Sequence, residues 1–372
     1  MLTSLCIVAF LVQAGYLGWL LMGTPARPSA PLTLSSSEPG PLPALTVIIA
    51  VRNERPHLPA LTQALHSQTH QAMHIVWVND HSSDGSAAWL DAYAADYPNV
   101  QVVHHTGTPG KKHALGAGIQ AAPTTHLAFT DADCIPPPTW LETLARIHQK
   151  YRDEQADGAQ SSPVLVGPSL LDTPRGLLQR LAGYETWTAQ IAMLAAAQHG
   201  HPYMAVGRNI SYSGAAYHRV SGHDAHSVLL SGDDDLFVQA AHAQGLPVRA
   251  VWRADAQVPT APPTSWSRWL RAQRRHTSTG RAYARGPALH LTAYYASALL
   301  LWMAPLLAGP VGAGLLALRL IGISHLLHRG ANVLRADAPT VLFPLWDAAH
   351  TVLRIGTSAA GLLVPPTRWS SR

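Results

Sequence analysis

Short apolar runs alternate with amphipathic stretches over residues 44–262, and the two kinds of segment predict different elements. Leu45–Val51 is almost continuously apolar and β-branched, as expected of a strand buried on both faces of a parallel sheet. Leu58, Leu61 and Leu65 follow at the spacing of one helix face. Similar apolar runs predict further strands at residues 74–78, 100–103, 126–130, 164–167 and 248–252. This alternation predicts an α/β fold with a doubly wound, mostly parallel sheet.

Longer apolar stretches outside this region predict transmembrane helices. Residues 2–22 contain no charged side chain and are long enough to cross a bilayer, which takes about 20 residues. We expect a retained anchor there, because no Lys or Arg precedes Arg27; a cleaved signal peptide is the alternative. Residues 288–309 and 311–328 predict two more spans, and residues 343–364 predict either a weaker fourth span or an interfacial helix.

Polar residues in and around these stretches indicate how they are oriented. Asp347, His350 and Arg354 recur at helical spacing, which suits the interior of a helix bundle. Residues 264–285 are rich in Trp and Arg, which predicts an amphipathic helix at the headgroup surface. By the positive-inside rule, these Arg residues place the α/β region in the cytoplasm. The chain is then expected to be a multi-pass protein of the cell (inner) membrane.

The composition favours a membrane protein. Of 372 residues, 47% are hydrophobic and only 13% are charged, which is a low charged share for a soluble domain. A basic helix can also bind nucleic acid, but the adjoining apolar spans argue against that partner here. Cys6 and Cys134 lie in unrelated contexts, so neither a disulfide framework nor a zinc site is indicated.

Carboxylates follow two of the predicted strands. Asp80 comes after the strand at 74–78, and Asp131 and Asp133 come at the end of the strand at 126–130. The carboxyl ends of parallel strands meet at one sheet edge, where α/β proteins bind ligands, so we expect these side chains to converge. Hard oxygen ligands suit Mg²⁺ or Mn²⁺, which usually bridge carboxylates to substrate phosphates. A solvated turn is the alternative, but it explains three carboxylates at one edge poorly.

These segments resemble the start of a family 2 glycosyltransferase with the nucleotide-diphosphosugar (GT-A) fold. The resemblance rests on the run Val-Ile-Ile-Ala-Val-Arg-Asn-Glu at 47–54, Gln68-Thr69, residues 78–86, Lys112 with Ala114-Leu115 and Gly118-Ile119, and the Asp-x-Asp segment 129–133. It departs from the family's Gly-Lys-x-x-Ala-Leu-Asn-x-Gly run at Gly116, which stands in the Asn position.

The resemblance implies a hexosyltransferase-like enzyme that transfers a sugar from a nucleotide-sugar with inversion, usually with a divalent metal. By position, Asp80 would contact the base, Asp131 would lie near the ribose and the sugar, and Asp133 would hold Mg²⁺ or Mn²⁺ on the diphosphate. The residues expected to line the donor pocket with them are Ala50, Arg52, Glu54 and Lys112.

The second half of the α/β region is expected to bind the acceptor and to supply a base. Asn209 resembles the Asn of the family's Gly-x-Asn segment at the acceptor site; an ordinary turn residue is the alternative. Asp233, Asp234 and Asp235 precede a predicted helix, whose positive end they would stabilise. An inverting transfer also needs a base for the acceptor hydroxyl. The resemblance favours Asp234, and a shift of one residue would make it Asp233.

Residues 273–277 resemble the family's Gln-x-x-Arg-Trp motif in degenerate form, because His276 and Thr277 stand at the Arg and Trp positions. That departure argues against a processive enzyme, although Arg274 or Arg275 is still expected to meet the diphosphate. The predicted order is an anchor (1–23), a Pro/Ser-rich linker (24–43), a GT-A domain (44–262), an interfacial helix (263–287) and about three membrane helices (288–372).

The sequence therefore predicts a membrane-bound, metal-assisted, inverting glycosyltransferase. Its expected partners are a nucleotide-sugar, with a UDP-sugar preferred, and a lipid-linked or glycan acceptor. The alternatives are a processive polysaccharide synthase of the same fold and a non-catalytic membrane scaffold.

Overall fold

The computed structural model describes residues 1–30, 41–154, 162–172, 175–222 and 232–363, and the chain forms two compact units. The sheet unit consists of residues 30–170 and 200–261, and the helical unit of residues 1–29, 171–199 and 262–367. Residues 171–199 interrupt the sheet unit in sequence, so one helix of the expected 44–262 domain belongs to the helical unit. The predicted linker falls largely on residues 31–40, outside the described part.

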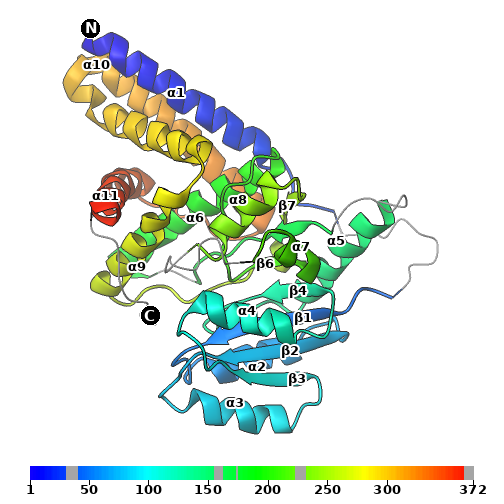
Figure 1. Ribbon diagram of the computed structural model, residues 1–372. Coiled ribbons are helices and arrows are strands. Elements are labelled where there is room, and N and C mark those ends of the chain that lie inside the picture. The colour runs from blue at the N-terminus through cyan, green and yellow to red at the C-terminus, as the bar shows by residue number, and fades with distance from the viewer. Residues whose placement is uncertain (31–40, 155–161, 173–174, 223–231, 364–372) are drawn as a thin grey trace. The chain divides into compact units, whose positions relative to one another are not determined.

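The sheet has seven strands in the order β3-β2-β1-β4-β6-β5-β7 (Figure 1). They are β1 (Leu45–Val51), β2 (Met73–Asn79), β3 (Val100–His104), β4 (His126–Phe129), β5 (Val164–Val166), β6 (Ile210–Ser213) and β7 (Val248–Ala250). β1 pairs in parallel with β2 and β4, which confirms the mostly parallel sheet. β6 runs antiparallel to both of its neighbours, β4 and β5. Its sequence, Ile-Ser-Tyr-Ser, is too short and polar to be predicted as a strand.

Helices cover both faces of this sheet. They are α2 (Leu58–His66), α3 (Ser86–Ala95), α4 (Lys111–Ala121), α5 (Trp140–Glu154), α7 (Gly214–Arg219), α8 (Asp235–Ala243) and the short η2 (Ala254–Ala256). α2 begins at Leu58, and Gly85 is the N-cap of α3. Asp84 stabilises that terminus, because its Oδ1 accepts a hydrogen bond from the Ser86 backbone N–H.

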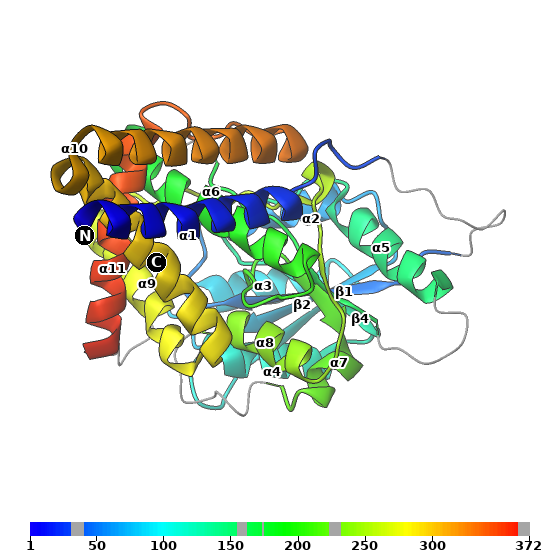
Figure 2. The same ribbon diagram turned by 90° about the horizontal axis from the view of Figure 1, so that it is seen from above.

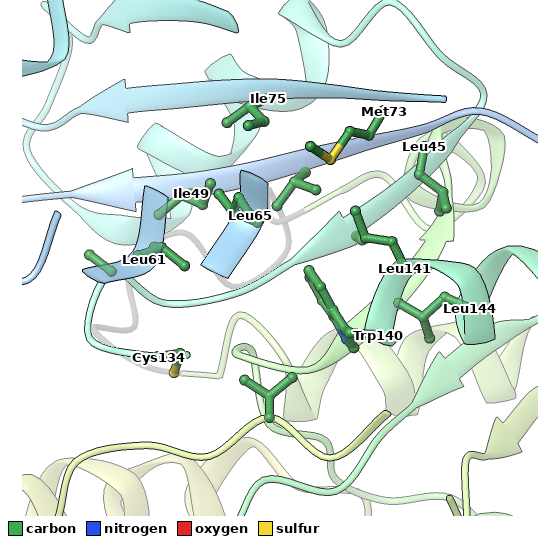
Figure 3. Close-up of a cluster of buried hydrophobic side chains, with 14 of the residues drawn as sticks. Leu45, Ile49, Leu61, Leu65, Met73, Ile75, Cys134, Trp140, Leu141 and Leu144 are labelled. Carbon is green, nitrogen blue, oxygen red and sulfur yellow. The ribbon is translucent and has the colours of Figure 1, made fainter. Parts of the chain in front are cut away.

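The period of two along β1 divides its side chains between the two layers. Ile49 packs with Leu61 and Leu65 of α2 and with Trp140 of α5 in the buried cluster of Figure 3. Ile48 faces α4, whose Gly118 lies so close that a Cβ would come within 2.6 Å of the Ile48 Cγ2 atom. Burying one such side chain stabilises the fold by about 1.5–3 kcal/mol. The strand ends that carry the polar residues therefore rest on a closely packed base.

The helical unit contains α1 (Leu2–Gly23), α6 (Gly176–Gln198), α9 (Trp266–Ser278), η3 (Thr279–Ala282), α10 (Arg285–Leu334) and α11 (Phe343–Leu363). α1 lies along α10 in both views (Figures 1 and 2). Of the described helices, only α1 and α10 are long and apolar enough to cross a membrane, a property that signal sequences and buried core helices share. α10 breaks its helical geometry at Ala308 and Gly309, which separates the two stretches expected as two spans. α11, over its described residues, is not among the helices that are long and apolar enough to cross a membrane.

A buried ion pair joins α10 to α11. The Arg319 guanidinium donates to both carboxylate oxygens of Asp347, and its Nε donates to the side-chain amide oxygen Oε1 of Gln13 on α1 at 2.9 Å. Tyr184 Oη and Trp302 Nε1 also donate to Asp347, at 2.7 and 2.8 Å. The expectation that Asp347 faces the interior of the bundle is therefore confirmed.

Candidate active site

Asp80 follows β2 and is almost completely buried, with 1% of its surface exposed. Its Oδ2 accepts a hydrogen bond from the Gly110 backbone N–H at 2.9 Å and lies 3.7 Å from an Arg52 guanidinium nitrogen. His81 Nδ1 lies 3.0 Å from the other carboxylate oxygen, Oδ1. Asp80 thus connects the carboxyl ends of β1 and β2 to the start of α4.

The segment after β1 is held by side chains of residues 82–86. Asn53 has a positive φ of 57°, and its Oδ1 accepts a hydrogen bond from the Ser83 backbone N–H at 2.7 Å. The Glu54 backbone N–H donates to Ser86 Oγ at 3.2 Å, and the Glu54 carboxylate contacts His57 at 2.7 Å. Ala50 is half-buried inside β1. These contacts fix the strand end where Ala50, Arg52 and Glu54 were expected to line a pocket.

Lys111, the first residue of α4, connects carboxylates that lie about 100 residues apart in sequence. Its Nζ lies 2.8 Å from Asp131 Oδ1 and 3.4 Å from Asp233 Oδ2. Burial disfavours its charge, but Asp131 and Asp233 outweigh that effect and raise the pKa of Lys111. Lys111 is therefore protonated, and it brings Asp131 and the Asp233 cluster into one site.

The Asp-x-Asp segment turns directly after β4. The Cys134 backbone N–H donates to the Asp131 carbonyl at 3.1 Å, which closes the turn, and Asp133 is half-buried. Within the described residues, no group of three or more His, Cys, Asp or Glu side chains has the arrangement of a metal site. Mg²⁺ is usually held by one or two carboxylates together with substrate phosphates, so these hard oxygens suit an ion that binds with a diphosphate.

The acidic cluster before α8 contacts the loop that leads into β6. Asp234 Oδ2 accepts a hydrogen bond from the Gly207 backbone N–H at 2.7 Å, and Oδ1 accepts one from the Asp235 N–H at 2.8 Å. Asp235 is held separately by the Ala205 N–H at 3.1 Å. A Cβ on Gly207 would lie 3.3 Å from Asp233 Oδ2 and 3.5 Å from Asp234 Oδ2. Glycine therefore allows the loop to approach both carboxylates closely.

Asp234 has a shifted affinity for protons. Burial, and then the charge of Asp233, raise the pKa of Asp234 to about 6, against the opposing effect of Lys111 and two backbone N–H groups. A carboxylate with a pKa near 6 is largely ionised at pH 7, yet it accepts a proton more readily than an ordinary Asp. This is the property that a general base needs.

Lys111 is a site residue that sequence reasoning missed. We expected Lys112 to line the pocket, but Lys111 is the residue that contacts Asp131 and Asp233. Lys112 is nearly buried; burial lowers its pKa, while Asp233 and Asp234 oppose that shift. The signal was present in the sequence, because Gly-Lys-x-x-Ala-Leu counted from Gly110 puts its Lys at 111.

Asn209 makes structural hydrogen bonds within the sheet unit, and its expected role at the acceptor site stays a prediction. Its side chain is buried, and its Nδ2 donates to the carbonyls of Pro168 and Ala256 at 2.7 and 2.8 Å. Its Oδ1 accepts a hydrogen bond from Trp140 Nε1 at 3.0 Å. These bonds hold the base of the loop that carries Gly207. Arg274 and Arg275 lie on α9 of the helical unit, and their approach to a diphosphate stays a prediction.

Comparison with known proteins identifies the class of this domain. Residues 46–175 match the family model described as "Glycosyl transferase family 2". The chain is 36% identical over 100 residues to an uncharacterised glycosyltransferase, YibD, of Escherichia coli K12, covering 27% of this chain and 29% of that protein. It is 31% identical over 103 residues to the glycosyltransferase AglE of Haloferax volcanii, covering 27% of this chain and 34% of that protein.

A solved structure extends the similarity to the fold of almost the whole chain. The mannosyltransferase PcManGT of Pyrobaculum calidifontis, in complex with GDP-Man and Mn²⁺, superposes with a TM-score of 0.60 at 20% identity. The match covers 96% of this chain and 99% of that chain. Residues 46–175 are thus a family 2 glycosyltransferase domain with a GT-A-like α/β fold. The curated relatives are matched over only about a third of their length, 29% and 34% in the two examples above.

Proposed function

We propose that this protein is a membrane-associated, inverting glycosyltransferase that moves a sugar from a nucleotide-diphosphate donor to a lipid-linked or glycan acceptor. The observation that carries the proposal is the group formed by Asp131, Asp233 and Asp234 around Lys111 at the strand ends of a family 2 domain. A scaffold has no need to hold several carboxylates together, because like charges destabilise one another.

The donor is proposed to bind at the edge formed by β1, β2 and β4. Asp80 and Arg52 are proposed to lie beside the nucleobase of the donor, and Asp131 is proposed to lie beside its sugar. The sequence favours a uridine nucleotide, whereas the mannosyltransferase of similar fold was solved with GDP-Man. Activity with a panel of nucleotide-sugars therefore has to determine which nucleobase the donor carries.

Asp133 is proposed to hold Mg²⁺ or Mn²⁺ together with the diphosphate. The ion would neutralise the charge that develops on the departing nucleoside diphosphate. Arg274 and Arg275 are proposed to add positive charge to the same leaving group. Guanidinium groups suit that role, because they bind phosphate oxygens through two parallel hydrogen bonds.

Asp234 is proposed to take the proton of the acceptor hydroxyl as its oxygen attacks the anomeric carbon. The two backbone N–H groups on Asp234 fix its direction, and its pKa of about 6 keeps it ionised at neutral pH. Asp233 is the alternative base, and Asn209 contributes indirectly by holding the Gly207 loop.

The membrane is proposed to supply the acceptor. α1 and α10 have the length and composition of spanning helices, and α9 carries exposed Trp266 and Arg residues suited to the headgroup region. We propose that the catalytic domain faces the cytoplasm, where nucleotide-sugars are made.

The test is release of nucleoside diphosphate by the full chain in detergent, with UDP-, GDP- and other sugars, in Mn²⁺ or Mg²⁺, with and without lipid acceptors. We expect release from one donor class and its loss on chelation or in Asp133→Ala. A Lys150→Met variant, altered on α5 and outside the site, is the control for the effect of substitution. If no donor is turned over under any condition, the scaffold alternative stands; if Asp133→Ala is fully active, the metal assignment is wrong.

A further inference from the structure

Lys111 stands where helix electrostatics disfavour it. It is the first residue of α4, followed by Lys112, and the first turn of α4 contains no acidic residue. The N-terminus of a helix carries partial positive charge, so a Lys there is less favourable than a neutral residue. The position therefore depends on compensation from outside the helix, and Asp131 and Asp233 provide it.

The contacts of Lys111 cross the site from one substrate side to the other. Asp131 follows β4 on the proposed donor side, and Asp233 precedes α8 beside the proposed base. The side chain of Lys111 is 22% exposed and that of Asp233 is 11% exposed, so solvent screens the Lys111–Asp233 interaction only in part. Lys111 is consequently a cation that contacts both carboxylates and fixes the separation between them.

The start of α4 is itself anchored to the donor side. Asp80 accepts the Gly110 N–H directly before Lys111, and Gly118 packs α4 against Ile48 of β1. The backbone of Lys111 is thereby fixed at both the polar edge and the apolar layer. A change in the Asp80 environment would be transmitted to Lys111 through one residue.

We propose that Lys111 is a positioning residue that sets the proposed catalytic pair, Asp233 and Asp234, relative to the donor-side Asp131. This inference rests on the proposed function. Lys111 lies 3.4 Å from Asp233 Oδ2, while the Gly207 and Asp235 N–H groups aim Asp234. Lys111 transfers no proton and forms no bond in the reaction; it keeps the base and the donor in register.

The experiment compares Lys111→Met, Lys111→Arg and Lys150→Met in the full chain. Lys111→Met keeps the length of the aliphatic stem and removes the charge, and Lys111→Arg restores the charge. For Lys111→Met we expect kcat to fall about 10- to 100-fold, the effect of losing one hydrogen bond to a charged group. The donor KM should change less than about threefold, because the lost contact orders the base rather than binds the nucleotide.

The measured kcat values support or overturn the positioning role of Lys111. Recovery of kcat to within about fivefold of wild type in Lys111→Arg, with Lys150→Met unaffected, supports the positioning role. The thermal transition and the Kd for nucleotide are measured for every variant, so that a folding defect is recognised; equal kcat losses in Lys111→Met and Lys111→Arg overturn the charge argument. Wild-type kcat in Lys111→Met overturns the proposal while leaving the proposed function intact. Absence of donor binding and turnover in the wild type overturns the proposed function and this inference together.

Discussion

The two units each contain a charged cluster, and the clusters differ in charge balance. In the helical unit, Arg319 and Asp347 pair one to one, and neutral donors and acceptors complete their hydrogen bonds. In the sheet unit, Lys111 and Lys112 act on Asp131, Asp233 and Asp234, so carboxylates outnumber ammonium groups. The Arg319 cluster is buried, whereas Lys111 and Asp131 are 22% and 25% exposed.

The difference separates a structural ion pair from a reactive group. In a balanced, fully hydrogen-bonded pair each charge is already compensated, and removal of either partner is strongly destabilising. An excess of carboxylates raises the affinity for protons and for cations. Burial, and then the charge of Asp233, accordingly raise the pKa of Asp234 to about 6. The helical cluster should therefore govern stability, and the sheet cluster should govern activity with little effect on stability.

The largest expected effect is on transfer. Asp234→Asn keeps the shape of the side chain and removes the base, so kcat should fall about 100- to 10,000-fold. Calorimetry should show nucleotide binding close to wild type. Asp233→Asn tests the alternative base, which lies one residue away. If Asp233→Asn alone stops transfer, the base is Asp233; if neither does, the cluster is not the base.

The next effect is on stability in the helical unit. Arg319→Met leaves Asp347 buried without its cation, and breaking such a pair costs about 3–5 kcal/mol. Chemical unfolding in detergent measures this loss. The double variant Arg319→Met/Asp347→Leu should recover part of it, because no buried charge then remains. Equal stability of wild type and Arg319→Met would contradict the structural reading of this pair.

A substitution at Asn209 tests whether this residue stabilises the fold or binds the acceptor. Asn209→Ala removes the partners of Trp140 Nε1 and of two carbonyls, and each buried group left unpaired costs about 1–3 kcal/mol. We expect a loss of about 3 kcal/mol in unfolding free energy, with an acceptor KM near wild type. A raised acceptor KM at unchanged stability would instead place Asn209 at the acceptor.

The smallest expected effect is a loss of folding stability at low pH, and it does not involve the candidate active site. Burial, and then the charge of His126, hold the pKa of His148 well below its ordinary value of 6.5. The unfolded chain binds a proton there more readily than the folded one. This contribution is therefore complete above about pH 6.5 and is lost at up to about 1.4 kcal/mol per pH unit below it. His148→Gln, compared with wild type between pH 7 and pH 5, should show a shallower loss on urea unfolding, and equal slopes would contradict it.

Much of the sheet unit was predictable because its signals are local. The apolar run of β1 and the Leu spacing of α2 determine their elements, and Asp80 and Asp131 follow from where parallel strands end. The Lys111 contacts depend on how a long side chain reaches Asp233, which lies 122 residues later, and no local pattern encodes that. The hydrogen bonds of Asn209 could not be predicted for a related reason: its partners, Trp140, Pro168 and Ala256, come from three separate segments.

If the excess carboxylate of the sheet unit works as a base, kcat at saturating donor and acceptor must depend on pH. Asp234 must be ionised to accept a proton, so activity should increase with pH through its pKa of about 6. We expect kcat to rise about tenfold per pH unit below pH 6 and to level off above pH 7. A kcat that stays constant between pH 5 and pH 7, in a protein that remains folded, would contradict it.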